Sequence, residues 1–203
     1  TAKALVDRLL CSMAKVDLWR YRRFAINRDE AKRLMQAHAD LEDFAGKLFI
    51  EDKMRTVSAI RARCNALNDK FPLGLILVDY AQMAQSETRK DSRNHEVGDI
   101  INGLKAIAVD FNVPVIALSQ MSRRVEMRLD RRPDLSDLRE SGEIEQTADT
   151  VIFIHADKED QQTQQDNSYI LPVTLIIAKQ RNGPIGDLPF MFHKQYTRFE
   201  EAN

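Results

Sequence analysis

The sequence predicts an α/β fold with a largely parallel central sheet and a C-terminal β-hairpin. Two observations predict it. Short apolar runs alternate along the chain with longer amphipathic stretches of helical spacing, a pattern typical of strands buried in a parallel sheet between helices. The last two long apolar runs are joined through Asn182, Gly183 and Pro184, which strongly favour a turn.

Four stretches have the spacing of amphipathic helices. Their apolar positions fall within residues 5–13, 31–45, 57–71 and 97–111. Asn27 and Thr56 are good N-caps for the second and third of these helices. Gly46 is expected to end the second helix. A further short helix is expected from about Ser141 to Ala148.

The predicted strands are short apolar runs bounded by polar or turn-forming residues. They lie at residues 48–50, 74–78, 113–118, 150–154, 172–178, 188–192 and 196–199. The polar segments 85–96 and 157–168 are interpreted as loops. Because ligands bind at the carboxyl ends of strands in such sheets, the polar residues that follow the strands matter most for function.

Size and charge limit the possible functions. A length of 203 residues suits one well-cored domain, so we expect a single domain over residues 1–203. The formal net charge is -1, and any contact with DNA therefore has to come from a local basic patch.

The cysteines and histidines indicate no disulfide framework and no structural zinc. Cys11 and Cys64 lie among apolar residues without CxxC spacing, and the 4 histidines are scattered. The longest apolar run, residues 73–78, is too short to span a bilayer. We therefore expect a cytoplasmic protein in a reducing compartment.

Asp79 and Gln120 each follow a predicted buried strand. A carboxylate at a rigid strand end can hold Mg²⁺, usually through water, and an amide on the neighbouring strand can sense a terminal phosphate or orient the attacking water. Each residue alone is equally compatible with an ordinary polar strand end, and their pairing favours the functional interpretation.

Arg139, Glu140 and Gly142 precede or begin the short predicted helix. Arg139 offers a forked donor to phosphate, and Gly142 lets the backbone approach a ligand closely. A simple N-terminal cap of the helix is the alternative, and it is favoured when this segment is taken alone.

Lys179 and Arg181 flank Gln180 at the tip of the last long hairpin. Strand alternation points both cations to one face, from which they can reach a phosphate on a neighbouring subunit. A solvated basic hairpin is the commoner outcome for such a pair.

Two further groups are open to a nucleic-acid interpretation. The arginine-rich stretch 122–132 can contact a phosphate backbone, although Glu126 and Asp130 dilute its charge, and a solvated face is favoured. Trp19, Tyr21 and Phe24 can stack on bases, but helix packing is favoured for them.

Taken together, the order and spacing of five segments resemble the DnaB family of hexameric replicative helicases. The segments are LILVDYAQM (75–83), VPVIALSQMSR (113–123), DLRESGEIEQTAD (137–149), IAKQRNGP (177–184) and YTRF (196–199). The third and fourth are the most specific, and the resemblance covers essentially the whole chain.

The resemblance implies a RecA-like three-layer fold and an ATP-driven hexameric ring that translocates on single-stranded DNA and unwinds duplex. By similarity, Asp79 would be the Walker B residue that binds Mg²⁺, and Gln120 would sense the phosphate of ATP. Arg181 would be the arginine finger offered to the next subunit's ATP, with Lys179 beside it. The segment holding Arg139, Glu140 and Gly142 would follow the DNA backbone. A primase and a helicase loader are the further partners implied.

The chain departs from the pattern of the DnaB family in one respect, and this leaves a rival hypothesis open. No GxxxxGK[ST] phosphate-binding loop occurs in the chain, and in the family this loop and a catalytic glutamate lie upstream of the first helix seen here. We therefore expect a trimmed motor domain that does not hydrolyse ATP alone. The rival is a non-hydrolysing RecA-like relative that binds DNA or caps a helicase ring.

Overall fold

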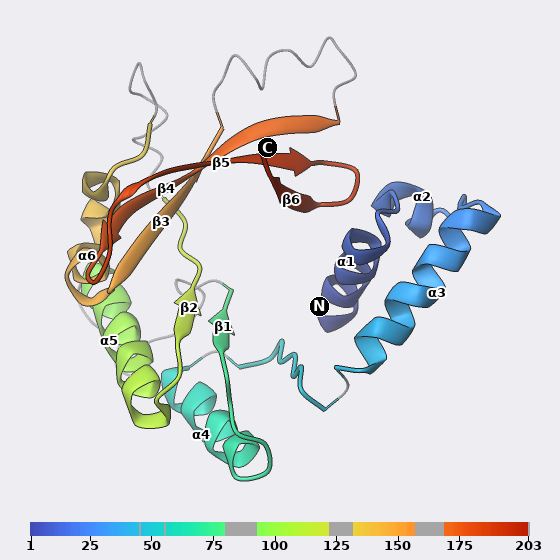
Figure 1. Cartoon of the computed structure of the whole chain (residues 1–203). Coiled ribbons are helices and arrows are strands. Elements are labelled where there is room, and N and C mark those ends of the chain that lie inside the picture. The colour runs from blue at the N-terminus through green and yellow to red at the C-terminus, as the bar shows by residue number, and fades with distance from the viewer. Residues whose placement is uncertain (45, 55, 80–92, 122–131, 157–168, 203) are drawn as a thin grey trace. The chain divides into compact units, whose positions relative to one another are not determined.

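The computed structural model describes residues 1–44, 46–54, 56–79, 93–121, 132–156 and 169–202 (Figure 1). The chain divides into two compact units. Unit 1 comprises Thr1–Asp52, Ile154–Ile176 and Asp187–Asn203, and unit 2 comprises Lys53–Phe153 and Ile177–Gly186.

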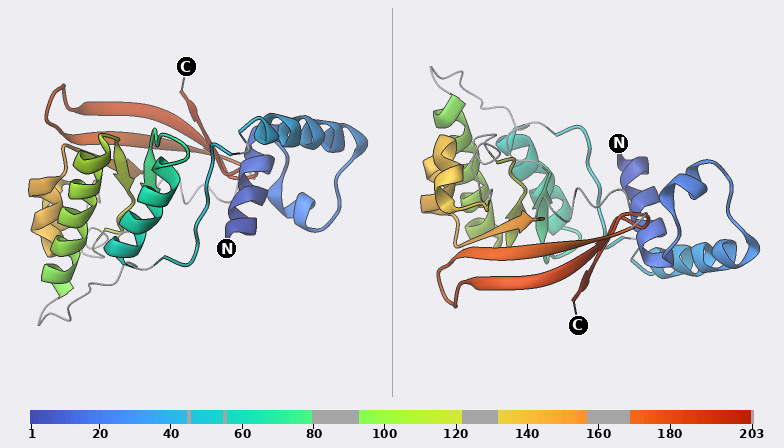
Figure 2. Two further views of the ribbon diagram at one scale, coloured as in Figure 1. Left: turned by 90° about the horizontal axis from the view of Figure 1, so that it is seen from below. Right: turned by 90° about the horizontal axis from the view of Figure 1, so that it is seen from above.

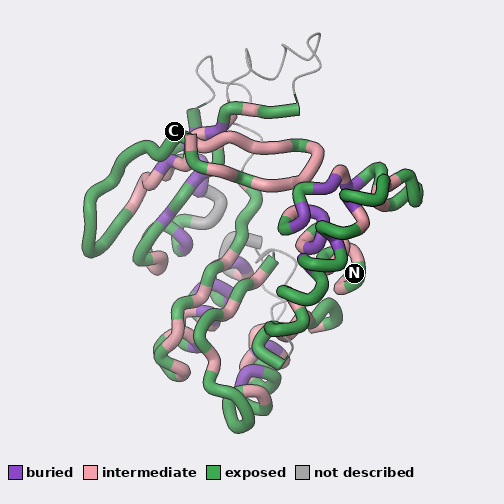
Figure 3. The backbone as a smooth tube through the Cα atoms, turned by 45° about the vertical axis from the view of Figure 1, so that its right-hand side comes forward, coloured by how far each residue is buried: buried purple, intermediate pink, exposed green. Residues whose placement is uncertain are grey.

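Unit 1 contains three helices whose ends are fixed by side-chain caps. They are α1 (Ala2–Ala14), α2 (Leu18–Arg22) and α3 (Arg28–Glu42), capped by Thr1, Asp17 and Asn27 respectively. Their apolar faces form one cluster around the fully buried Cys11 and Val16. Figure 3 colours the backbone by burial. Removing this surface from water stabilises the unit.

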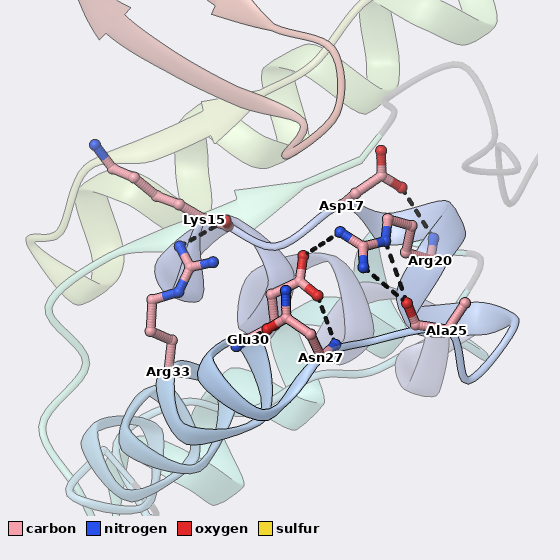
Figure 4. Close-up of polar contacts among 7 residues, drawn as sticks. All are labelled: Lys15, Asp17, Arg20, Ala25, Asn27, Glu30 and Arg33. Atoms are coloured by element: carbon pink, nitrogen blue, oxygen red, sulfur yellow. Dashed lines mark hydrogen bonds and ion pairs between the residues drawn. The ribbon is translucent and has the colours of Figure 1, made fainter.

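Glu30 is a buried carboxylate that joins α2 to α3 (Figure 4). Its Oε1 accepts from the Arg20 guanidinium at 2.6 Å, and its Oε2 accepts from the Asn27 backbone N–H at 2.8 Å. The Asn27 side chain in turn accepts from the Glu30 N–H at 2.9 Å, which completes a capping box. Arg20 also donates to the Ala25 carbonyl at 3.0 and 3.2 Å, so the loop between the helices is fixed.

Unit 2 is built around α5 (Arg93–Phe111), which packs against α4 (Val57–Asn68) and α6 (Gly142–Thr147). Two glycines permit the close approach. A Cβ at Gly103 would lie 2.6 Å from a Val57 methyl carbon, and one at Gly98 would lie 2.7 Å from Glu143 Cγ. Figure 2 shows α4 and α5 side by side, as this packing requires. A 3₁₀ helix, η3 (Leu135–Ser141), leads directly into α6.

The strands form two sheets. In the first, β1 (Ile76–Val78) pairs in parallel with β2 (Val115–Ala117). The second has the order β3-β4-β5-β6, with bounds Thr150–His155, Ile170–Gln180, Gly186–His193 and Arg198–Glu201. The turn at Asn182–Pro184 joins β4 to β5, and β5 pairs antiparallel with β6.

Most predicted elements are confirmed, and the differences have local causes. The strand predicted at residues 48–50 is wrong, because the segment has no regular structure. Helix α3 ends at Glu42, before Gly46, which has a φ of 82° in the following turn. The sequence also predicted one sheet, whereas the described strands lie in two. The α/β class is confirmed, and the three-layer arrangement and the single domain stay predictions.

Both cysteines, Cys11 and Cys64, are buried free thiols. Burial is the main cause that raises the pKa of the Cys11 thiol to about 11. Within the described ranges, no helix is long and apolar enough to cross a membrane.

Candidate functional site

Asp79 and Gln120 lie at the same edge of the parallel β1–β2 sheet. Strand β1 ends at Val78, which is paired with Ala117 of β2, and the next N–H, that of Leu118, donates to the Val78 carbonyl at 2.9 Å. Asp79 is the first residue after β1, and Leu118 is the first residue after β2. Gln120 lies two residues beyond Leu118. Both side chains are exposed, which leaves this edge accessible to a ligand.

The connection between the two strands explains why their ends, which are far apart in the sequence, lie side by side. Parallel strands need a crossover, usually a helix, and α5 supplies it between β1 and β2. Its buried face anchors the connection through five apolar residues: Val97, Ile100, Ile101, Leu104 and Ile107. The Ile76 N–H donates to the Pro114 carbonyl at 3.1 Å and begins the ladder that sets the register.

Lys179 and Arg181 lie where β4 enters its turn. The Lys179 ammonium donates to the carbonyls of Glu145 and Gln146 at 2.5 and 3.4 Å. These carbonyls lie in the last turn of α6, whose partial negative charge attracts a cation. Arg181 forms an ion pair of 2.8 Å with Asp149, just beyond that helix. Both cations therefore bind the segment formed by the end of α6 and its link to β3.

Asp149 and Lys105 complete this group, and the sequence analysis assigned no role to either. The Lys105 ammonium pairs with Asp149 Oδ2, while Arg181 pairs with Oδ1. The hydrogen bond from Lys105 is the main cause that lowers the pKa of the Asp149 carboxyl, and the charges of Lys105, Arg181 and Lys179 act in the same direction. Asp149 was visible within the 137–149 motif, but no local signal identifies Lys105 as its partner.

The segment from Arg139 to Gly142 spans the end of η3 and the start of α6. Asp134 begins η3 with a capping box that includes Asp137. The side chains of Arg139 and Glu140 lie outside the described residues. Gly142 has a φ of -50°, and a Cβ there would meet nothing within 4 Å. Neither its backbone conformation nor a described neighbour requires glycine at this position.

The remaining nucleic-acid candidates have different outcomes. Within the arginine-rich stretch, residues 122–131 lie outside the described part of the chain. Trp19 and Phe24 are 68% and 92% exposed, so the helix packing predicted for them is wrong, whereas Tyr21 packs against the unit 1 core. The Arg23 guanidinium lies 5.6 Å from the Trp19 ring centroid, a cation–π contact.

The chemistry of the site suits phosphate. No group of three or more His, Cys, Asp or Glu within the described residues is arranged to hold a metal. A single strand-end carboxylate such as Asp79 suits Mg²⁺ that takes its other ligands from water and substrate phosphates. The β1–β2 edge offers this carboxylate and an amide, while the β4–β5 turn offers two cations.

Comparisons with known proteins agree on one family. The model of the DnaB-like helicase C-terminal domain matches residues 1–201. The chain is 42% identical over 201 residues to the replicative DNA helicase DnaC of Bacillus subtilis (strain 168) and 41% identical over 201 residues to the replicative DNA helicase DnaB of Geobacillus stearothermophilus. Each match covers 98% of this chain and 43% of the relative. The chain thus spans less than half the length of these relatives.

Two solved structures are also similar. One is described as an ATPase domain, and it matches with a TM-score of 0.87 and 30% identity over 100% of this chain and 72% of the other. The second is described as a DnaB-like replicative helicase and its interactions with primase. It matches with the same TM-score of 0.87 and 30% identity, and the match covers 100% of this chain and 48% of that chain.

Proposed function

Because this chain belongs to the DnaB-like helicase C-terminal domain family, we propose that it is the motor domain of an ATP-dependent replicative DNA helicase. In this proposal the complete protein forms a hexameric ring, translocates on single-stranded DNA and unwinds duplex. The observation that carries the proposal is the placement of Asp79 and Gln120 at one edge of the parallel β1–β2 sheet, within a family match over residues 1–201.

Asp79 and Gln120 take the roles of nucleotide chemistry. Asp79 holds Mg²⁺, which when bound neutralises charge on the phosphates of ATP. The exposed carboxylate at the end of β1 fits this role, because Mg²⁺ binds through few protein carboxylates and keeps several waters. Gln120 has an amide that both donates and accepts, so it can contact the terminal phosphate and the attacking water together.

Arg181 and Lys179 act on the ATP of the neighbouring subunit. The Arg181 side chain is 56% exposed in the turn that follows β4, so it can reach beyond its own subunit. A guanidinium placed on the transferring phosphoryl group stabilises charge that develops in the transition state. Because the ring must assemble to bring it there, hydrolysis becomes coupled to the arrangement of subunits.

Arg139, Glu140 and Gly142 form the contact with single-stranded DNA. Gly142 is exposed and has no side chain, so a nucleic-acid backbone can approach it closely, and Arg139 supplies a donor to phosphate. Such contacts carry no sequence information, which suits a motor that moves along any sequence.

Primase and a helicase loader are the proposed partners beyond DNA and the other subunits. Support for primase comes from the similar solved structure described with its primase interactions. The loader follows from the family resemblance alone, and the proposed cytoplasmic location is the one expected from the sequence.

The alternative is a non-hydrolysing relative that binds DNA or caps a ring. ATP turnover of the complete protein that contains this chain separates the two. We expect Mg²⁺-dependent turnover stimulated by single-stranded DNA, and we expect Asp79→Asn to abolish it. A complete protein that binds DNA but shows no turnover would establish the alternative.

A further inference from the structure

Asp149 contacts Arg181 through both its backbone and its side chain. Its carbonyl accepts from the Arg181 backbone N–H at 2.9 Å, and its Oδ1 accepts from Arg181 Nη1 at 2.8 Å. The first bond fixes where the chain leaves β4, and the second fixes the direction of the guanidinium. Asp149 itself lies in the short link between α6 and β3.

The Asp149 carboxylate is held from a second element. Lys105 of α5 pairs with Oδ2, so the two oxygens are divided between two cations. The hydrogen bond from Lys105 lowers the pKa of the Asp149 carboxyl, so this contact favours the charged carboxylate. Without Lys105, Asp149 would be free to rotate with the arginine that it binds.

Two neighbouring contacts show that the end of β4 is tied to the same segment. Lys179 donates to the last carbonyls of α6, and Gln180 accepts from the Thr150 hydroxyl. Three consecutive residues of β4 and its turn, 179–181, are thus bonded to residues 145–150. The turn has a defined place relative to α6 before any neighbouring subunit arrives.

We propose that Asp149 is the positioning residue for Arg181: its carboxylate, held by Lys105, orients the guanidinium for a phosphate on the adjoining subunit. This inference rests on the proposed function of Arg181. A guanidinium has five N–H donors, and the bond from Nη1 to Asp149 leaves the rest of the fork for phosphate.

Orientation matters because a long side chain loses rotamer freedom when it binds. An arginine whose guanidinium is already oriented loses less rotamer freedom in the transition state. Positioning to within about 0.5 Å strongly affects the rate there. The alternative is that Asp149 only helps the fold. Exposed ion pairs contribute little to folding, and both side chains here are about half exposed, at 56% and 48%.

A double-mutant cycle on ATP turnover of the complete protein tests the inference. We expect Asp149→Ala to lower kcat about 10-fold with KM for ATP within about twofold of wild type, whereas loss of the finger itself costs on the order of 10³-fold. Asp149→Asn, which keeps the Oδ1 acceptor, should recover part of the loss. In an Arg181→Ala background, Asp149→Ala should lower kcat no further, because two residues that act as a unit are not additive.

The matched control is Asp110→Ala, which removes the carboxylate of another exposed ion pair, with Arg61. Asp110 is 50% exposed, close to the 48% of Asp149, and it contacts neither β4 nor its turn in the described structure. Its kcat should match wild type. Amide hydrogen exchange supplies a readout that is independent of turnover. Exchange in residues 179–185 should rise several-fold in Asp149→Ala and stay unchanged in Asp110→Ala.

The outcomes separate the inference from the function on which it rests. An unchanged kcat or unchanged exchange in Asp149→Ala would overturn the inference, as would an equal loss of kcat with and without Arg181. If Arg181→Ala turns over ATP like wild type, or the complete protein shows no turnover, the proposed function itself fails and the inference falls with it.

Discussion

Replacing Glu30 by alanine should destabilise unit 1 by about 2–3 kcal/mol. The carboxylate is buried and makes two bonds, one to Arg20 and one to the Asn27 N–H. Loss of a partner for the partly buried Asn27 N–H costs about 1 kcal/mol. Loss of the charge-assisted bond adds about 1–2 kcal/mol, because Arg20 is 47% exposed and recovers much of its hydration.

Urea unfolding of the chain, followed by circular dichroism and by the fluorescence of its single tryptophan, Trp19 in α2, measures this loss. The matched control is Glu42→Ala at the end of the same helix, where the carboxylate is 70% exposed and pairs only with His38 among the described residues. The control should shift the free energy of unfolding by less than about 0.5 kcal/mol. Equal losses in the two variants would refute the assignment of Glu30 as the link between α2 and α3.

Four further outcomes are expected. Gly103→Ala should lower the free energy of unfolding, measured in urea, by about 1–3 kcal/mol, because its Cβ would meet Val57. A Cβ at Gly142 would meet nothing within 4 Å, so Gly142→Ala should unfold like wild type but bind single-stranded DNA less tightly. Cys11 should resist thiol reagents at pH 8 until the chain unfolds, since burial raises its pKa to about 11. In the unfolded chain the Cys11 thiol ionises at a lower pH than in the folded chain. The neutral thiol therefore contributes fully to folding stability below about pH 8.5, and this contribution is lost as the pH rises through 11. Arg139→Ala should lower the salt slope of single-strand binding by about one, and an unchanged slope would remove Arg139 from the phosphate contacts.

The sequence predicted best where a local pattern determines the structure. The helical spacing of apolar residues within 97–111 was enough to predict α5. The turn-forming residues Asn182–Pro184 were enough to predict the turn between β4 and β5. The placement of Asp79 and Gln120 at one edge of the sheet was expected because each follows a buried strand of a predicted parallel sheet. By contrast, α2 has five residues, too few to display a helical period, and the apolar segment 48–50 resembled a strand by composition alone.

The group around Arg181 shows what local patterns leave out. Lys105 and Asp149 are 44 residues apart in the chain, and only the packing of α5 against α6 brings them together. Arg181 was identified from the hairpin and the family motif, yet its partner was not, because an aspartate before a strand looks like an ordinary loop residue. Long-range ion pairs of this kind require the folded arrangement.

ATP turnover by mixed rings of the complete protein shows whether Arg181 acts on the ATP of the neighbouring subunit. Arg181→Ala subunits keep Asp79, and Asp79→Asn subunits keep Arg181, so each variant alone should be inactive. If Arg181 serves the neighbouring subunit, random mixing in a ring should restore up to about a quarter of the sites, because some interfaces then hold both intact residues. Recovered turnover is the result predicted here. If mixed rings stay inactive although both variants assemble and bind ATP, Arg181 does not act on the ATP of the neighbouring subunit.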